Sequence, residues 1–165
     1  MKIGVISDTH LKISTPFLNR VIGHYFKDVD LVLHAGDITT PDVLEAFNGK
    51  ELIAVSGNMD SPEIKRRFPQ KETVTVKGIT MGLTHGTGSP FGITKRVRVL
   101  FPQIDCIVFG HTHVPMNKTE GGTLFFNPGS FKACIPHFWR RTIGILEIKD
   151  GIKGRVIRIP RSFRK

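Results

Sequence analysis

The stretch Ile104-Asp-Cys-Ile-Val-Phe-Gly-His-Thr-His113 decides the fold, because an apolar run ends directly in a pair of histidines. Four more apolar runs end in the same way, in Asp8 and His10, in Asp37, in Asn58 and in His85. Short apolar runs of this kind predict buried strands. Polar side chains just after the carboxyl ends of strands are typical of sites in open α/β sheets. The five strands by themselves predict one sheet with donor side chains along a common rim.

Helix signals lie between the first strands. Each is a Ser or Thr followed by Pro, which is the usual pair at an N-cap and the first helical position. The four pairs are Thr15-Pro16, Thr40-Pro41, Ser61-Pro62 and Ser89-Pro90. They predict four helices, and they place the donor side chains in strand-to-helix loops.

The second half of the chain has antiparallel signals. Residues 73–81 predict two short strands around Lys77-Gly78, and residues 141–159 predict a hairpin with its turn at Asp150-Gly151. A further strand is predicted at 123–126. Mixed βαβ units followed by antiparallel pairs indicate an α/β (α+β) fold with two sheets packed face to face and helices outside. We expect residues 1–165 to form a single domain.

Bulk properties narrow the class of protein. Lys and Arg number 24 against 14 Asp and Glu, a formal net charge of +10 that favours anionic partners. The two cysteines, Cys106 and Cys134, are too few for a disulfide framework or a thiolate zinc site. The chain enters a strand at Met1-Lys2-Ile3, and no apolar stretch approaches the ~20 residues that cross a bilayer. We therefore expect a cytoplasmic enzyme with no membrane partner.

The residues at the strand ends are metal-type donors. They comprise four imidazoles, two carboxylates and one amide: Asp8, His10, Asp37, Asn58, His85, His111 and His113. Seven donors are too many for one tetrahedral ion and suit two ions that share a carboxylate. Two metals ~3.5–4 Å apart can hold both oxygens of an in-line phosphoryl displacement. Mixed nitrogen and oxygen donors favour Mn, Fe, Zn, Co or Ni over copper(I), and the imidazoles argue against Ca or Mg.

These donors stand in five blocks that resemble those of the calcineurin-like metallophosphoesterases. The blocks are Asp8-x-His10, Gly36-Asp37, Gly57-Asn58-x-Asp60, His85-Gly86 and Gly110-His111-x-His113. The segment Asn127-Pro-Gly-Ser130 and the short length resemble the small bacterial and archaeal phosphodiesterase branch. The resemblance implies a metallophosphoesterase domain with a four-layer α-β-β-α sandwich of two mixed sheets.

The resemblance also implies which donors bind each of the two ions. One ion would take Asp8, His10, Asp37 and His113, and the other would take Asp37, Asn58, His85 and His111. Asp37 would bridge, and Asp37 and Asn58 are the expected catalytic residues. Manganese is the expected metal, with nickel, zinc, iron and cobalt as alternatives. A metal-bridging hydroxide would be the nucleophile.

One position departs from the family pattern. Many members have His directly after the motif Asn, where it protonates the leaving group, whereas this chain has Met59 after Asn58. General acid catalysis contributes typically ~10²–10⁴-fold. We therefore expect faster cleavage of diesters with good leaving groups than of alkyl diesters.

Several residues have simpler structural interpretations. We expect His24 and His137 to be ordinary surface residues, and His34 to be either a core residue or a partner of a donor. Asp60 is expected to cap the helix near Pro62. The glycine-rich loop 86–92 lacks the third glycine of a dinucleotide loop, so its glycines are expected to turn the chain beside His85.

The sequence leaves three functions open. The leading one is a metal-dependent phosphodiesterase acting on a small phosphodiester. The second is a nuclease on single-stranded nucleic acid, for which Phe131, Phe138 and Trp139, interleaved with Lys132, Arg140 and Arg141, would form the surface. The third is a non-catalytic, retromer-like scaffold of the same fold. A homo-oligomer and a role for the basic segment 149–165 also stay open.

Overall fold

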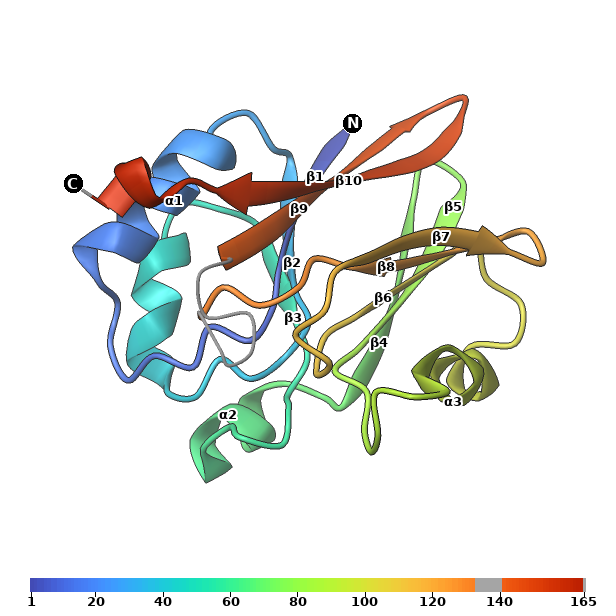
Figure 1. Cartoon of the computed structure of the whole chain (residues 1–165), viewed down its shortest axis with the longest axis horizontal. Helices are drawn as coiled ribbons and strands as arrows, with labels where there is room; N and C mark the ends of the chain where they lie inside the picture. The colour runs from blue at the N-terminus through green and yellow to red at the C-terminus, as the bar shows by residue number, and fades with distance from the viewer. Residues whose placement is uncertain (133–140, 165) are drawn as a thin grey trace.

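The computed structural model describes residues 1–132 and 141–164, whose strands form two five-stranded mixed sheets (Figure 1). The first sheet has the order β10-β9-β1-β2-β3. Its strands are β1 (Lys2–Ile6), β2 (Leu31–His34), β3 (Leu52–Ala54), β9 (Arg141–Lys149) and β10 (Gly151–Ile159). The second sheet has the order β4-β5-β6-β8-β7. Its strands are β4 (Lys71–Val76), β5 (Ile79–Thr84), β6 (Cys106–Phe109), β7 (Met116–Glu120) and β8 (Thr123–Asn127).

The five donor-bearing strands are divided between these sheets. β1, β2 and β3 are parallel neighbours in the first sheet, and β5 and β6 are parallel neighbours in the second. The expectation of one sheet is therefore wrong. The apolar runs alone could not reveal the division, because strands of one sheet and of two facing sheets have the same pattern. The prediction of two facing sheets, which came from the antiparallel pairs, is confirmed.

Helices cover both outer faces and complete the predicted four-layer sandwich (Figure 1). α1 (Pro16–Tyr25) and the 3-10 helix η1 (Pro41–Phe47) pack against the first sheet, and α3 (Ile93–Leu100) packs against the second. β6 illustrates the layering, because successive side chains point to opposite faces of a strand. Cys106 and Val108 lie between the sheets, whereas Ile107 and Phe109 contact the α3 layer.

The helix starts follow the Ser/Thr-Pro signals only in part. Thr15 caps α1 and Ser61 caps α2 (Pro62–Arg67), each by accepting a hydrogen bond from a backbone amide three residues on. Thr40-Pro41 begins the 3-10 helix η1 without a side-chain cap. The helix predicted from Ser89-Pro90 is present as α3, but its predicted start is wrong, because α3 begins at Ile93 after Gly92, which has a φ of 72°.

The predicted turns of the second half are confirmed. β4 and β5 pair around Lys77-Gly78, and β9 and β10 pair around the Asp150-Gly151 turn. The sequence did not predict β7, whose residues are mostly polar and exposed. A short 3-10 helix, η2 (Arg161–Arg164), ends the described chain. Within the described residues no helix is long and apolar enough to cross a membrane.

Candidate metal centre

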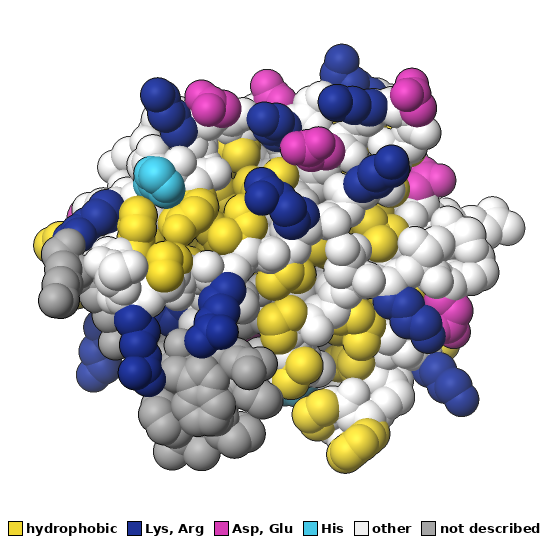
Figure 2. Space-filling model, turned by 45° about the horizontal axis from the view of Figure 1, so that its top comes forward, with side chains coloured by type: hydrophobic (Ala, Val, Ile, Leu, Met, Phe, Trp, Pro, Cys, Tyr) yellow, Lys and Arg dark blue, Asp and Glu magenta, His cyan; other side chains and the backbone are white. Residues whose placement is uncertain are grey.

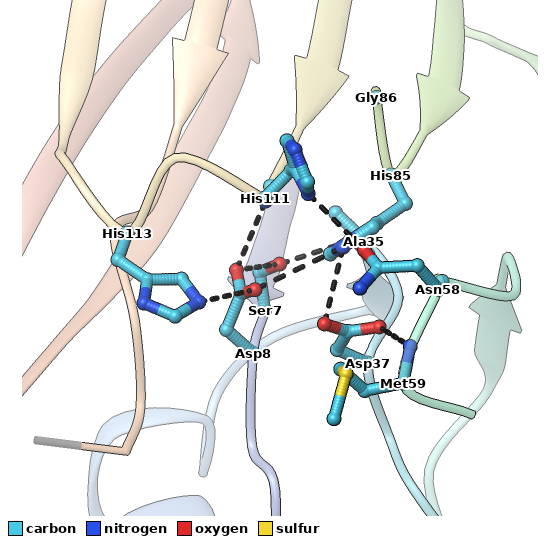
Figure 3. Close-up of polar contacts among 12 residues, drawn as sticks. Ser7, Asp8, Ala35, Asp37, Asn58, Met59, His85, Gly86, His111 and His113 are labelled. Carbon is cyan, nitrogen blue, oxygen red and sulfur yellow. Dashed lines mark hydrogen bonds and ion pairs between the residues drawn. The ribbon is translucent and has the colours of Figure 1, made fainter. Parts of the chain in front are cut away.

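The donor side chains converge where the carboxyl ends of both sheets meet (Figure 3). Asp8 follows β1, Asp37 follows β2, and His85 follows β5. His111 and His113 come from the loop after β6. The parallel strands of each sheet point toward the same edge, so residues far apart in the sequence are brought together there.

Backbone strain is concentrated in these donors. Seven residues other than glycine have a positive φ among those that the structure describes, and five of them are donors: Asp8, His10, Asp37, His111 and His113. Asp and His tolerate this left-handed conformation better than most residues. Each such residue costs of order 1–3 kcal/mol, and such residues cluster at functional sites. The loops therefore hold these side chains in place against a local conformational cost.

Two glycines leave room for the carboxylates. A Cβ atom at Gly57 would lie 2.5 Å from the backbone nitrogen of Asp37 and would also clash with Asp37 Oδ1. A Cβ atom at Gly110 would clash with Ser7 Oγ, which donates to Asp8, and would lie 2.8 Å from the Ala35 carbonyl oxygen and 2.9 Å from Asp8 Oδ2. A larger residue would press on Asp37 at the first position and on the Ser7 hydroxyl that holds Asp8 at the second. The glycines of the sequence blocks thus serve the packing of the donors.

One group of donors forms around Asp8. His113 Nε2 lies 3.0 Å from Asp8 Oδ1, and His10 Nε2 lies 3.7 Å from the same oxygen. The two imidazole nitrogens, His10 Nε2 and His113 Nε2, are 3.3 Å apart. One ligand atom from each of Asp8, His10 and His113 therefore fits around a common point.

A second group joins the two carboxylates to His85. His85 Nε2 lies 3.3 Å from Asp37 Oδ2 and 4.0 Å from Asp8 Oδ1, while its Nδ1 lies 2.7 Å from the carbonyl oxygen of Ala35. The Ala35 carbonyl accepts a hydrogen bond from Nδ1–H and so leaves the Nε2 lone pair directed at the carboxylates. Asp8 belongs to both groups, whereas the family resemblance assigns the bridging role to Asp37.

Asn58 and His111 lie at the edge of the centre and contact each other. His111 Nδ1 is 3.2 Å from Asn58 Oδ1, and His111 Nε2 is 2.8 Å from the carbonyl oxygen of Gly88. Both of these oxygens are acceptors, so a neutral His111 ring donates to one of them, the Gly88 carbonyl at the shorter distance. The structure brings five of the seven predicted donors into candidate metal groups and places these two beside them.

The donor atoms fit a cation better than they fit one another. Asp8 is fully buried, and the groups nearest its Oδ1 are other donors of the centre, His113 Nε2 at 3.0 Å and His85 Nε2 at 4.0 Å. Neither Asp8 Oδ1 nor His85 Nε2 forms a hydrogen bond of good geometry with a described residue. A buried polar atom without a partner costs about 1–3 kcal/mol. Carboxylate oxygens and imidazole nitrogens that face a shared point suit a divalent transition ion.

The charges in the centre depend strongly on one another. Burial would raise the pKa of Asp8, but the imidazoles of His10 and His113 lower it well below its usual range. Burial would also raise the pKa of Asp37, but the contact with His85 lowers it below its usual value. The Asp8 carboxylate raises the pKa of His113, and the Asp37 carboxylate raises that of His85 against the effect of burial. Both carboxylates are therefore anionic at neutral pH, which is the state that binds a cation.

Hydrogen bonds around the centre position the donors. Ser7 Oγ donates to Asp8 Oδ2 at 2.6 Å, a role that the sequence did not reveal although Ser7 directly precedes the motif. Asn127 Nδ2 donates to the carbonyl of Gly110 at 2.8 Å, and Ser130 Oγ donates to the carbonyl of Asp8 at 3.2 Å. The segment Asn127–Ser130 thus lies beside the site, as the resemblance implied.

Asp60 does not cap a helix, contrary to expectation, since Ser61 fills that position. Asp60 Oδ2 instead accepts a hydrogen bond from the backbone amide of Gly57 at 2.7 Å, and its Oδ1 accepts one from the amide of Thr39 at 2.5 Å. Burial raises the pKa of Asp60. The carboxyl group therefore ties the loop after β3 to the loop after β2.

His34 is a core residue that reaches the centre only indirectly. Its ring is fully buried, and its Nε2 lies 3.2 Å from Oγ1 of Thr9. Thr9 stands in the sequence between the donors Asp8 and His10. Burial lowers the pKa of His34 to about 3, so the ring is neutral. His24 lies against Tyr25 and Phe163 in an aromatic cluster.

The proposed nucleic-acid surface finds little support in the described residues. Phe131 is fully buried and lies against Phe17, so it offers no face for stacking. Arg141 donates to the Phe131 carbonyl at 2.8 Å. Cys134, His137, Phe138, Trp139 and Arg140 lie outside the described residues.

Comparisons with known proteins agree with this centre. Residues 1–151 match the calcineurin-like phosphoesterase superfamily domain. A probable metallophosphoesterase of Methanothermobacter thermautotrophicus is 34% identical over 155 residues, which cover 93% of this chain and 88% of that protein. The solved structure of an archaeal phosphodiesterase superposes with a TM-score of 0.79 at 25% identity, covering 96% of this chain and all of that one (100%).

A third comparison concerns the fold alone. Vps29 of Entamoeba histolytica, solved in complex with zinc, has a TM-score of 0.71 at 24% identity and covers 96% of this chain and 99% of its own. The family match covers residues 1–151, and the alignment with the archaeal relative covers 93% of the chain, so the similarity is not confined to the donor blocks. The chain therefore belongs to the calcineurin-like phosphoesterase superfamily.

Proposed function

We propose that this phosphoesterase is a phosphodiesterase that holds two divalent transition ions at the carboxyl ends of its two sheets. Asp8, His10 and His113 would hold one ion, and Asp8, Asp37 and His85 would hold the other, with Asn58 and His111 beside it. The observation that carries the proposal is the meeting of Asp8 Oδ1 and His85 Nε2, which are 4.0 Å apart, buried, and without a hydrogen bond of good geometry among the described residues.

When bound, such ions supply a hydroxide at neutral pH and positive charge for the phosphoryl oxygens. The chain's own contribution is to keep both carboxylates anionic and fixed. Ser7 holds Asp8 Oδ2, and the Met59 backbone amide holds Asp37 Oδ1 at 2.8 Å, so one oxygen of each carboxylate stays directed at the centre. We keep Asp37 and Asn58 as the proposed catalytic residues. Manganese stays the proposed metal, because it binds at sites that combine oxygen and nitrogen donors.

The preference for diesters with acidic leaving groups rests on the missing proton donor after Asn58. Met59 cannot transfer a proton, and the other described histidines outside the centre are occupied elsewhere: His24 in an aromatic cluster and His34 in the core. Departure of the alcohol must then depend on its own acidity. The similarity to the archaeal phosphodiesterase favours diesters over monoesters as the substrate class.

A small diester is favoured over single-stranded nucleic acid. Figure 2 shows Lys and Arg side chains spread over the face in view rather than gathered in one groove. A groove that follows a nucleic-acid backbone needs aligned positive charge and exposed aromatic side chains. The non-catalytic scaffold remains the alternative of a different class, and a cytoplasmic location and a homo-oligomer remain predictions.

A panel of substrates tests the function. Chelated protein is assayed on aryl and alkyl phosphodiesters, phosphomonoesters, cyclic nucleotides and single-stranded DNA, with Mn, Ni, Zn, Fe or Co restored in turn. We expect aryl diester hydrolysis that returns with manganese and falls at least ~100-fold in His113→Ala. The matched control is His24→Ala, which removes an imidazole far from the centre and should keep full activity. No metal-dependent turnover on any substrate would support the scaffold instead.

A further inference from the structure

Exposed apolar side chains concentrate on the loops that carry the candidate donors. Of the large apolar side chains in the described part of the chain, six are exposed. Four stand on donor-bearing loops: Ile13, Met59, Phe91 and Val114, which are 60%, 59%, 88% and 48% exposed. The other two, Val99 and Leu100, lie at the end of α3. Single exposed apolar residues are normal, but a group around a polar site indicates a binding surface.

Met59 and Val114 are direct neighbours of donors. Met59 follows Asn58, and its backbone amide donates to Asp37 Oδ1 at 2.8 Å, so its side chain starts beside the centre (Figure 3). Val114 follows His113, whose Nε2 is 3.0 Å from Asp8 Oδ1. Both apolar side chains therefore begin one residue from a group that faces the reaction site.

Phe91 is carried to the same site by a loop. His111 Nε2–H donates to the carbonyl of Gly88 at 2.8 Å, which joins the loop 86–92 to the donor loop after β6. Phe91 stands three residues later in this loop and is the most exposed large apolar residue that the structure describes. A phenylalanine ring in water is unfavourable unless a ligand covers it.

Arg96 holds this loop in one conformation. From the second turn of α3, its guanidinium donates to the carbonyls of Thr87 and Phe91, at 3.0 Å each, and to that of Ser89. One side chain thus fixes three carbonyls of a short loop. Phe91 is presented in a preset position, which lowers the conformational entropy lost when a ligand covers it.

We infer that Ile13, Met59, Phe91 and Val114 form an apolar lip that binds an organic group of the substrate. The phosphate would lie at the donor centre, and an aromatic or large apolar ester group would lie against the lip. This inference rests on the proposed function and names its substrate class: phosphodiesters with an aromatic or bulky apolar ester group. Lys65 of α2 adds positive charge near the phosphate, because its Nζ donates to the Asn58 carbonyl at 3.0 Å.

Binding of two phosphinate analogues, whose P–C bonds are not hydrolysed, tests the lip without turnover. Protein loaded with diamagnetic zinc and carrying ¹³C-methyl methionine is titrated with diphenylphosphinate or dimethylphosphinate, and the Met59 methyl signal is followed by NMR. Buried Met81 serves as the internal reference. We expect diphenylphosphinate to bind about tenfold more tightly, the effect of burying part of one aromatic ring. Aryl diester hydrolysis is measured on the same protein loaded with manganese.

The deciding variants are Phe91→Ser and its control Val99→Ser. Both replace an exposed apolar residue, at 88% and 80% exposure, and the Arg96 bonds to backbone carbonyls persist in either. Loss of the diphenyl preference in Phe91→Ser alone supports the lip. Equal affinities in wild type, an unchanged preference in Phe91→Ser, or dissociation of a dimer by that substitution would overturn it. A preserved preference in a protein without hydrolysis would refute the phosphodiesterase but not the lip.

Discussion

Replacing Gly57 with Ala should damage the centre and the fold together. The added Cβ would lie 2.5 Å from the backbone nitrogen of Asp37 and would clash with its Oδ1, so neither rotamer change nor a small shift of one side chain relieves it. Overpacking of this kind costs typically ~1–3 kcal/mol. With a urea m-value of about 2 kcal/mol/M, the unfolding midpoint should fall by about 0.5–1.5 M. Displacement of the Asp37 carboxylate should also weaken manganese binding by about 10–100-fold.

Gly23→Ala provides the matched control. Gly23 is an exposed residue of α1, and a Cβ atom there would meet nothing within 4 Å. Removing a glycine from a helix should raise stability by roughly 0.5–1 kcal/mol and leave manganese binding unchanged. Urea unfolding of metal-free protein and calorimetric titration with manganese measure both quantities. If Gly57→Ala matched the wild type in midpoint and manganese affinity, the argument that Gly57 seats Asp37 would be refuted.

Three further predictions concern the donors and their surroundings. Metal-free His34→Gln should lose less stability than wild type as the pH falls from ~6.5 toward 3. In the wild type the buried ring, with its pKa lowered to about 3, stays neutral while the unfolded ring gains a proton, which favours unfolding. Urea midpoints that fall in parallel with pH in both proteins would contradict this. Aryl diesters should be cleaved faster than alkyl diesters, and Met59→His should raise alkyl rates by up to ~10²-fold; equal wild-type rates under chemistry-limited conditions would count against the missing acid. Asn127→Ala should lower the free energy of unfolding by about 1–3 kcal/mol and weaken manganese binding, because Asn127 holds the Gly110 carbonyl. The control Asn117→Ala removes an exposed hydrogen bond to the Gly154 carbonyl and should change neither quantity. Similar urea midpoints and manganese affinities in the two variants would argue against positioning by Asn127.

The donors could be predicted from the sequence because their signals are local. An apolar run that stops at Asp8 or His85 indicates a strand and its end at once, and the order of the blocks carries the family resemblance. The caps Thr15 and Ser61 are equally local, since each bonds an amide three residues away. These features need no knowledge of the rest of the chain.

Other features depend on contacts between distant segments. The loop 86–92 does not continue into a helix at Pro90, because Arg96 holds its carbonyls and Gly92 turns the chain before Ile93. Asp60 was assigned to a cap because Ser61 and Pro62 follow it, yet its partners are Gly57 and Thr39. β7 is polar because it is an edge strand that water covers on most of its length. Its pairing with β8, not its own pattern, makes it a strand.

The grouping of the donors was also beyond the sequence. Spacing suggests that Asp8, Asp37, His85 and His113 converge, but only the packing of two sheets sets Asp8 between His113 and His85. The exposure of Phe91 is likewise a tertiary property, since a phenylalanine beside Pro90 would ordinarily be expected in the core.

The metal content of the folded protein tests the central claim most directly. Chelated protein is dialysed against manganese, and the bound metal per chain is measured by elemental analysis alongside the His113→Ala and His24→Ala variants. We predict two equivalents in the wild type and in His24→Ala, and a loss of at least one in His113→Ala. A folded wild-type protein that retains no manganese, zinc, nickel, iron or cobalt, or a His113→Ala variant that retains as much as the wild type, would contradict the account.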